Sequence, residues 1–380
     1  MNASTRNGRI LGVGVGAFEA RNAGLFQSLA RRYEIVGMLR PELPKLEDYL
    51  IKLRYVHPDK DGWRARAVLN SRTFDRLTAI LDRQLTAWEG RYDLIMQLQT
   101  LFAPGRDRKQ RYVVYTDNTY SLTERSYPAW APLSGNQGRK WKRLEQLTCQ
   151  DARFVFTWSD LARRSVIEDY GCDPDRVIAV GAGTNSFAST LDGKHYDSKV
   201  ALFVGIDFER KGGPVLLRAW EEVRRRLAEA ELWIIGPKRS APKLAPEAGV
   251  RWLGHVTDRE VLARAYDRAA VFVLPSNFDP YPHVLREAMG HGLPCVGTAS
   301  GGIPQIIEDG RTGLVVPPGE PEVLAEALLD LLGEPQRAEQ MGRRGHADVL
   351  LNHTWENVVD RMAPSLDRAL SDVNRSSLSR

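Results

Sequence analysis

Two adjacent cations followed by two glycines stand between a short apolar run and an amphipathic segment. The apolar run ends at Gly205, the cations are Arg210 and Lys211, and Gly212 and Gly213 open the amphipathic segment. The first turn of a helix presents free N–H groups and the positive end of the helix dipole, so cations fixed beside it complete an anion site. The pattern predicts a diphosphate site in an exposed loop. Solvated surface charges are the alternative.

A second loop carries two carboxylates eight positions apart. The apolar run 271–274 is followed by prolines and Asn277, so that Asp279 falls in a loop. A helix is expected to begin near His283, which places Glu287 about one turn inside it. A carboxylate near a helix start can complement the helix dipole. It can also accept two hydrogen bonds from the neighbouring hydroxyls of a ribose.

A third glycine-rich turn follows the first apolar run. Gly12, Gly14 and Ala17 fit a relaxed G-x-G-x-x-A pattern, in which glycines let a pyrophosphate approach the start of a helix. The acidic residue that would hold a ribose is missing, because the second apolar run, 35–39, is followed by Arg40. An NADP-dependent oxidoreductase that uses Arg40 is one alternative. A turn that faces phosphate, or a plain tight turn, fits better.

Short apolar runs alternate with amphipathic segments along the chain. Strands are predicted at 10–15, 35–39, 94–97, 112–115, 154–157 and 177–180, and again at 201–204, 232–235, 250–253, 271–274, 294–298 and 313–316. Strands and helices in alternation are typical of parallel sheets covered on both faces. The two series predict an α/β protein with two doubly wound domains. Ligands of such folds bind at the carboxyl ends of the strands, where the loops described above are expected.

The composition is that of a globular protein. The chain has 380 residues, of which 43% are hydrophobic and 27% charged, which suits two domains and excludes a disordered chain. Three separated cysteines without a CxxC pair predict reduced thiols. Residues 1–195 hold 30 Lys and Arg against 22 Asp and Glu, whereas the rest holds 23 against 26. The basic first half would suit an anionic acceptor or the anionic face of a membrane, and a solvated surface is the alternative.

Taken together and in this order, the motifs resemble glycosyltransferase family 4, the retaining nucleotide-sugar transferases of GT-B fold. The resemblance covers about residues 140–360. It rests on Phe203-Val-Gly205, Glu209-Arg210-Lys211-Gly212, Asp279-x7-Glu287, Ser300-Gly-Gly-Ile-Pro304 and Asp309-Gly310-x-x-Gly313, with Asp151 and Ser159 upstream. Each motif alone is weak, and their common order makes the resemblance specific.

The resemblance implies a GT-B arrangement, in which two Rossmann-like domains face a central cleft. Residues 1–190 would form the acceptor-binding domain and residues 191–355 the nucleotide-sugar-binding domain. Residues 356–380 would form a helix that packs back on the first domain and a frayed tail. The enzyme would move a hexose-type sugar from a UDP- or GDP-sugar to a hydroxyl acceptor, in glycan, glycolipid or glycoconjugate biosynthesis.

The resemblance also assigns roles to single residues. Arg210 and Lys211 would bind the donor diphosphate and stabilise its charge as the glycosidic bond breaks. Glu287 would hold the ribose and Asp279 the donor sugar. The donor pocket would further include Gly16, Gly205, Gly236, His255, Val256, Pro282, His283 and Val284. No metal or other cofactor is expected, because the cations and the helix N-termini can neutralise the diphosphate.

Two positions depart from the family pattern. Asp279 stands where the family has a glutamate, which shortens the reach of the carboxylate by one methylene group. Thr116-Asp117 stands where many members have His-Asp, so Asp117 is the candidate acceptor-side catalytic residue. A sugar-nucleotide binding protein without catalysis is a further alternative.

The expected partners are a nucleotide-sugar donor and a glycan or lipid-linked acceptor. The basic stretches 106–111 and 224–226 come without a nucleic-acid reader fold, so no nucleic acid is expected. No apolar run is long enough to span a membrane. We expect a cytoplasmic protein that can touch an inner membrane face peripherally.

Overall fold

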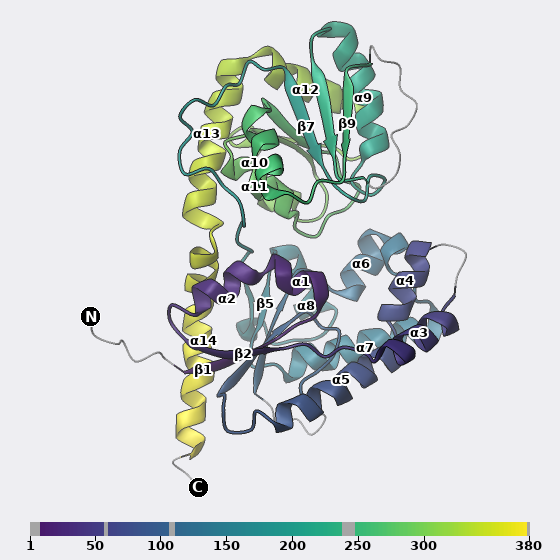
Figure 1. Cartoon of the computed structure of the whole chain (residues 1–380), viewed down its shortest axis with the longest axis vertical. Coiled ribbons are helices and arrows are strands. Elements are labelled where there is room, and N and C mark those ends of the chain that lie inside the picture. Colours follow the sequence, from purple (N-terminus) through teal and green to yellow (C-terminus); the bar gives the residue numbers. More distant parts are fainter. Residues whose placement is uncertain (1–7, 57–59, 106–110, 238–247, 378–380) are drawn as a thin grey trace, which may run out of the picture. The chain divides into compact units, whose positions relative to one another are not determined.

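The computed structural model describes residues 8–56, 60–105, 111–237 and 248–377. Most of the stretch 106–111 therefore lies outside the described residues. The chain divides into two compact units, which Figure 1 shows: unit 1 comprises residues 1–183 and 355–380, and unit 2 comprises 184–354. The first boundary falls a few residues before the expected one at 190. Among the described residues, no helix is long and apolar enough to cross a bilayer.

Unit 1 is built on a parallel sheet of six strands. The strands are β1 (Arg9–Val13), β2 (Glu34–Leu39), β3 (Leu94–Leu98), β4 (Tyr112–Thr116), β5 (Val155–Thr157) and β6 (Val177–Ala179). Their order in the sheet is β2-β1-β3-β4-β5-β6, and every neighbouring pair is parallel. All six strands lie where apolar runs predicted them, although β1 ends at Val13 and not at Val15.

Helices lie around this sheet. They are α1 (Gly16–Arg21), α2 (Ala23–Leu29), α3 (Lys45–Arg54), α4 (Lys60–Val68), α5 (Ser71–Thr86), α6 (Tyr120–Ser126), α7 (Gly135–Asp151), α8 (Asp160–Glu168) and α14 (Trp355–Ser377). The apolar face of α5 carries Leu77, Leu81 and Leu85 into the core formed with β3 and β4. Its start is fixed by the Asn70 side chain, which accepts a hydrogen bond from the N–H of Thr73 at 2.9 Å.

The final helix, α14, belongs to unit 1 and packs against α2, as Figure 1 shows. Its first residue, Trp355, lies between two glycines. A Cβ atom on Gly24 would come within 2.1 Å of the indole ring, and one on Gly183 within 2.3 Å. The Arg361 side chain also donates to the carbonyl of Val180 at 2.7 Å. The last helix thus packs against other elements of unit 1.

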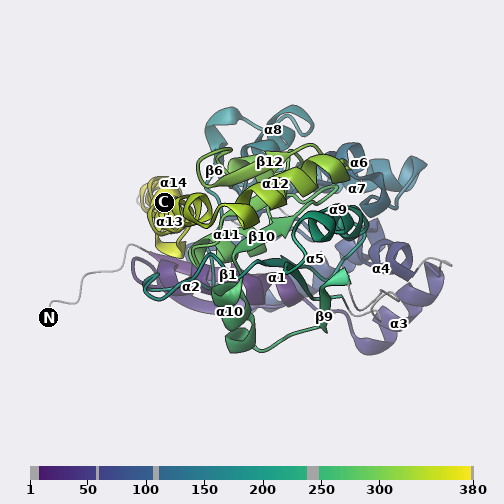
Figure 2. The ribbon, with the colours of Figure 1, turned by 90° about the horizontal axis from the view of Figure 1, so that it is seen from above.

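Unit 2 repeats the architecture. Its strands are β7 (Val200–Val204), β8 (Glu231–Ile235), β9 (Val250–Gly254), β10 (Val271–Leu274), β11 (Cys295–Thr298) and β12 (Gly313–Val316). Its helices are α9 (Gly213–Arg226), α10 (Arg259–Arg268), α11 (His283–Gly290), α12 (Pro321–Gly333) and α13 (Pro335–Asn352). The strand order is β12-β11-β10-β7-β8-β9, again all parallel. Helix α9 packs against α12, and Figure 2 shows both in the view from above.

Each sheet reverses its winding direction once, between two neighbouring strands. In unit 2 the chain runs outward from β7 through β8 to β9, then returns to β10 on the other side of β7. In unit 1 the corresponding neighbours are β1 and β3. The loops that leave two such strands diverge, and the crevice between them is where open α/β sheets bind ligands. In each unit, the loops that carry the predicted motifs therefore follow the carboxyl ends of strands, where ligands of such folds bind.

Candidate active site

The loops that follow β7 and β10 are locked together through their backbones. The N–H of Asn277 donates to the carbonyl of Arg210 at 2.8 Å, and Arg210 Nη1 donates to the carbonyl of Phe278 at 2.7 Å. Gly212 has a φ of +75°, and a Cβ atom there would lie 1.8 Å from the carbonyl oxygen of Pro275. Only glycine permits this approach, which explains the glycine directly after the two cations.

Three charged side chains meet where these loops touch. Asp279 Oδ2 accepts hydrogen bonds from Arg210 Nη1 and from Lys211 Nζ, both at 3.2 Å. Arg210 Nε also donates to Asp207 Oδ2 at 3.1 Å. Arg210 is only 6% exposed, and the Lys211 and Asp279 side chains are nearly as buried. The expectation of an exposed loop was therefore wrong: the β10 loop covers both cations.

Burial and pairing act in opposite directions on these groups. Burial alone would raise the pKa of Asp279, but the charges of Lys211 and Arg210 outweigh it and hold that pKa below its usual value. Burial lowers the pKa of Lys211, and Asp279 only partly restores it. The carboxylate thus stays ionised between two cations, and a second anion brought to this place would be attracted by the same pair.

A third loop supports Asp279 from behind. The N–H of Gly302 donates to the carbonyl of Asp279 at 3.0 Å. Gly301 has a φ of +58°, and a Cβ atom there would lie 1.9 Å from the same carbonyl oxygen. The hydroxyl of Ser300 donates to the carbonyl of Asn277 at 2.6 Å. The Ser300–Gly302 motif therefore holds the carboxylate loop in place through backbone contacts.

Helix α11 begins at His283 with Pro282 as its N-cap, as the sequence predicted. Glu287 lies in its second turn and accepts a hydrogen bond from the Tyr266 hydroxyl at 3.3 Å. Burial raises the pKa of Glu287 above its usual value, and nearby cations only partly oppose this. At the start of the helix, His283 Nδ1 lies 2.8 Å from Arg286 Nη2. Of the two expected carboxylates, Asp279 is thus buried in the loop and Glu287 half-buried on the helix that follows it.

The donor-pocket residues expected after β8 and β9 lie at the same edge of the sheet. The N–H of Gly205 donates to the carbonyl of Ile235 at 2.8 Å, and the N–H of Gly236 donates to the carbonyl of Gly254 at 2.7 Å. A Cβ atom on Gly236 would meet the backbone of Gly205 at 2.6 Å. His255 is exposed and Val256 half-buried, directly after β9. Val284 lies in the first turn of α11.

The glycine turn of unit 1 is surrounded by apolar side chains of the same unit. A Cβ atom on Gly12 would come within 2.8 Å of both Met38 and Phe26, and one on Gly14 within 3.0 Å of Leu98. These two glycines therefore leave room for neighbouring apolar side chains inside the unit. Gly16 is exposed, has a φ of +55° and begins α1.

Arg40, the cation of the oxidoreductase alternative, pairs with a carboxylate of α1. Arg40 Nε donates to Glu19 Oε2 at 2.6 Å, so the cation proposed for a 2′-phosphate is engaged in an ion pair.

Asp117, the candidate acceptor-side residue, follows the last residue of β4 and is half-buried. It lies close enough to Glu145 of α7 to raise the pKa of that buried carboxyl, to which burial contributes most.

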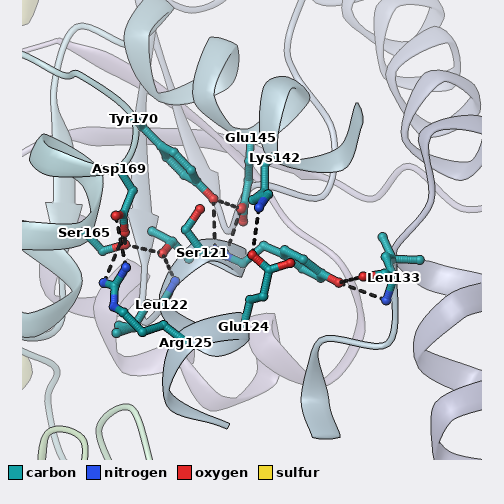
Figure 3. Close-up of polar contacts among 12 residues, drawn as sticks. Ser121, Leu122, Glu124, Arg125, Leu133, Lys142, Glu145, Ser165, Asp169 and Tyr170 are labelled. Atoms are coloured by element: carbon teal, nitrogen blue, oxygen red, sulfur yellow. Dashed lines mark hydrogen bonds and ion pairs between the residues drawn. The ribbon is translucent and has the colours of Figure 1, made fainter. Parts of the chain in front are cut away.

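Glu145 was missed by the sequence reasoning. It accepts hydrogen bonds from the Thr100 hydroxyl at 2.6 Å and from the N–H of Tyr120 at 2.9 Å, and the Tyr170 hydroxyl donates to it as well. Figure 3 shows Tyr170 and Glu145 pointing toward each other. A signal existed, because Glu145 shares the buried face of α7 with Trp141 at helical spacing. Asp207 was missed too, although it stands three residues before Arg210.

The comparisons with known proteins agree with this geometry. Residues 198–334 match the family model described as Glycosyl transferases group 1. The matched residues lie within unit 2 and include the loops after β7 and β10 and helix α11.

Two curated relatives extend the match. The chain is 27% identical over 277 residues to the D-inositol 3-phosphate glycosyltransferase of Corynebacterium efficiens, covering 66% of this chain and 64% of that protein. It is 36% identical over 181 residues to the phosphatidyl-myo-inositol mannosyltransferase of Mycobacterium tuberculosis, covering 45% and 47%. The chain spans a little under two thirds of the length of the first of these relatives.

Solved structures establish the fold as GT-B. The sucrose-phosphate synthase of Thermosynechococcus elongatus matches with a TM-score of 0.67 and 18% identity, over 96% of this chain and 99% of that chain. Anabaena Alr3699/HepE, solved in complex with UDP-glucose, matches with a TM-score of 0.64 and 14% identity, over 95% and 100%. The predicted α/β fold class and family resemblance are thus confirmed.

Proposed function

We propose that this protein is a retaining glycosyltransferase that moves a hexose-type sugar from a UDP- or GDP-sugar to a hydroxyl acceptor. The observation that carries the proposal is the meeting of Arg210 and Lys211 with Asp279 at the switch point of unit 2. Its support is threefold: the position in the fold, the match to group 1 glycosyl transferases, and the UDP-glucose held by the structurally similar HepE.

The two cations would act on the leaving diphosphate. Lys211 has three N–H donors, and Asp279 accepts from one of them, so further donors can reach a phosphate oxygen. As the glycosidic bond breaks, negative charge grows on the diphosphate, and cations already fixed by the protein stabilise it without reorganisation. Because Arg210 is held by Asp207 and by the carbonyl of Phe278, its position is set before the donor binds.

Glu287 and Asp279 would then divide the recognition of the donor. Glu287 stands on a helix and offers acceptor oxygens suited to the ribose hydroxyls. Asp279 stands beside the two cations, where the sugar joins the diphosphate. The departing phosphate oxygen can take the proton of the acceptor hydroxyl, which attacks from the same face, so that the anomeric configuration is kept. Asp117 would position the acceptor, and no metal or cofactor takes part in this scheme.

The acceptor is a hydroxyl compound of a glycan or a lipid-linked glycoconjugate. The relatives support this range, since their names include an inositol phosphate glycosyltransferase and a phosphatidyl-inositol mannosyltransferase. With a lipid-linked acceptor, the protein would work at the inner face of a membrane and would contact anionic lipid peripherally from the cytoplasm.

Thermal unfolding with UDP, GDP, ADP and CMP tests the donor class. A ligand that binds only the native state raises the melting temperature, so one of the two expected diphosphates should do so and CMP should not. Proton NMR of the first product, read before mutarotation, then gives the anomer. An inverted anomer would contradict the retaining mechanism and favour Asp117 as a base. Tight donor binding with no transfer to any acceptor would identify a binding protein without catalysis.

A further inference from the structure

Helix α3 of unit 1 presents leucine and tyrosine side chains to solvent at helical spacing. Leu46, Tyr49, Leu50 and Leu53 are 71%, 59%, 55% and 49% exposed. Positions i, i+3, i+4 and i+7 share one side of a helix, so these four side chains form a continuous stripe. Exposed apolar residues are common singly, but a stripe of four on one helix face marks an interaction surface.

The opposite side of α3 is held firmly to the unit. Ile51 is buried there, and Glu47 accepts a hydrogen bond from Arg76 Nη2 of α5 at 2.8 Å. The carbonyl of Lys52 accepts from the Trp63 indole of α4 at 2.7 Å. Figures 1 and 2 both show α3 at the periphery of unit 1 beside α4. The stripe therefore belongs to a well-anchored helix with its apolar side turned outward.

Cations flank the stripe on both sides. At about 100° per residue, Lys45 and Lys52 project beside one margin of the stripe and Arg54 beside the other. Among the described residues, no carboxylate pairs with Lys45 or Arg54, whereas Asp48 pairs with Lys52 at 2.5 Å. Apolar side chains between basic ones, with a tyrosine at the margin, are the pattern of helices that lie in the plane of a membrane surface.

We propose that α3 is the element that docks this protein on an anionic lipid bilayer, with Leu46, Tyr49, Leu50 and Leu53 entering the interface and Lys45 and Arg54 contacting lipid phosphates. The docking proposal rests on the proposed function, in which the protein contacts a membrane peripherally. It adds the helix that makes this contact. The charge of the flanks favours an anionic membrane over a second copy of this chain, because two such stripes facing each other would bring like charges together.

Co-sedimentation with vesicles tests the docking surface. The full chain, without donor, should bind phosphatidylcholine vesicles that contain 30% phosphatidylglycerol (about one anionic lipid in three) more tightly than pure phosphatidylcholine, and salt should weaken the binding. Leu50→Ser with Leu53→Ser should lower the partition coefficient about 10-fold or more, since two side chains can no longer enter the apolar layer. Lys45→Gln with Arg54→Gln should lower it about 25-fold at low salt, because each cation contributes about 5-fold.

A matched control comes from unit 2. Leu351 of α13 is 70% exposed but has no such stripe beside it, so Leu351→Ser should bind vesicles like the wild type. Wild-type binding by the stripe variants, or no preference for anionic vesicles, would overturn the proposal. If sedimentation velocity showed a dimeric wild type and a monomeric stripe variant, the surface would instead bind a second copy of the chain.

The two proposals can fail separately. The stripe variants should keep the thermal shift with the nucleotide that stabilises the wild type, because α3 is not part of unit 2. Vesicle binding without any nucleotide binding would leave the docking surface intact and refute the transferase. Nucleotide binding without vesicle binding would refute only the docking surface.

Discussion

Each unit contains a parallel six-stranded sheet with one switch point, but the strand orders differ, and so do the residues at the switch points. In unit 2 the loops after β7 and β10 bring Arg210, Lys211 and Asp279 together in a buried cluster. In unit 1, Gly12 inside β1 and Gly14 directly after it leave room for apolar side chains, and Gly14 packs against Leu98 of β3. A doubly wound sheet therefore supplies the place for a ligand, and the residues in the loops decide whether charge is fixed there.

The two units also differ in whether the family model matches them. The group 1 glycosyl transferase model covers residues 198–334, which lie wholly in unit 2. The donor diphosphate of the proposed function would impose a fixed chemistry on the buried cluster of unit 2. Unit 1 has instead a buried carboxylate network around Glu145 and an apolar stripe on α3.

The largest expected effect comes from removing a cation of unit 2. Lys211→Ala should lower kcat about 100-fold or more, because one fixed charge no longer stabilises the leaving diphosphate. Asp279 keeps Arg210 as a partner, so the fold should survive. Steady-state kinetics with the donor found by thermal shift measure the loss. Arg225→Ala, which removes an exposed cation paired with Glu222, is the control and should leave kcat unchanged.

Near-normal turnover of the Lys211 variant would make the cluster a purely structural ion pair. The comparison between the units would then lose its functional meaning. Asp117→Asn gives the matching measurement in unit 1. It should slow transfer less than Lys211→Ala does, because a positioning group can be replaced by an isosteric amide more easily than a fixed charge.

A second test concerns the backbone that holds the cluster. Gly212→Ala should unfold at a lower temperature and lose turnover, because its Cβ atom would collide with the Pro275 carbonyl. Gly319 is the control, since its φ is +83° but a Cβ atom there would meet nothing within 4 Å. Gly319→Ala should cost only about 1 kcal/mol of unfolding free energy, the strain of a left-handed alanine. Equal melting temperatures of the two variants would show that the loops are not locked together.

Sequence reasoning predicted the strands and the order of the motifs well. Twelve apolar runs corresponded to twelve strands, because parallel strands buried on both faces are continuous in their apolar residues. The start of α11 at His283 was also predicted, since the preceding prolines cannot continue a helix. The exposure of Arg210 and Lys211 was predicted wrongly, because the covering loop lies about 68 residues away in the chain.

Other features depended on contacts between distant segments and gave weaker signals. Gly12 and Gly14 fit a phosphate-binding pattern, yet their environment is set by Met38 and Leu98, which no local pattern places. Glu145 lay on an apolar helix face, but its partners Thr100 and Tyr170 come from other elements. Spacing along the chain predicts which face a residue occupies, and it does not predict what that face meets.

A third test separates the two carboxylates of unit 2. Glu287→Gln should weaken binding of the bare nucleoside diphosphate about 10-fold, because a charged acceptor for the ribose is lost. Asp279→Asn should leave that affinity unchanged or raise it, since it removes an anion that competes for Lys211 and Arg210. It should nevertheless reduce turnover or alter the choice of sugar. Calorimetry with the bare diphosphate measures both affinities, and equal losses would refute the division of roles.

The smallest expected effect tests the buried carboxylate of unit 1. Burial raises the pKa of Glu145 in the folded chain above its unfolded value of about 4.3. Between those two values the folded chain binds more protons than the unfolded chain, so the contribution of this group to stability falls as pH rises. Glu145→Gln cannot ionise and can keep hydrogen bonds to Thr100 and Tyr120. The variant should therefore gain stability relative to wild type as pH rises from 4 to 7.

Thermal unfolding of both proteins at several pH values measures this difference. Glu124→Gln is the control, because that carboxylate pairs with Lys142 near the surface, where an ion pair contributes little. Melting curves of the Glu145 variant that run parallel to the wild type at every pH would show that Glu145 takes up no extra proton on folding. In that case its hydrogen bonds from Thr100, Tyr120 and Tyr170 would hold an ionised carboxylate, and unit 1 would contain a fixed buried charge as unit 2 does.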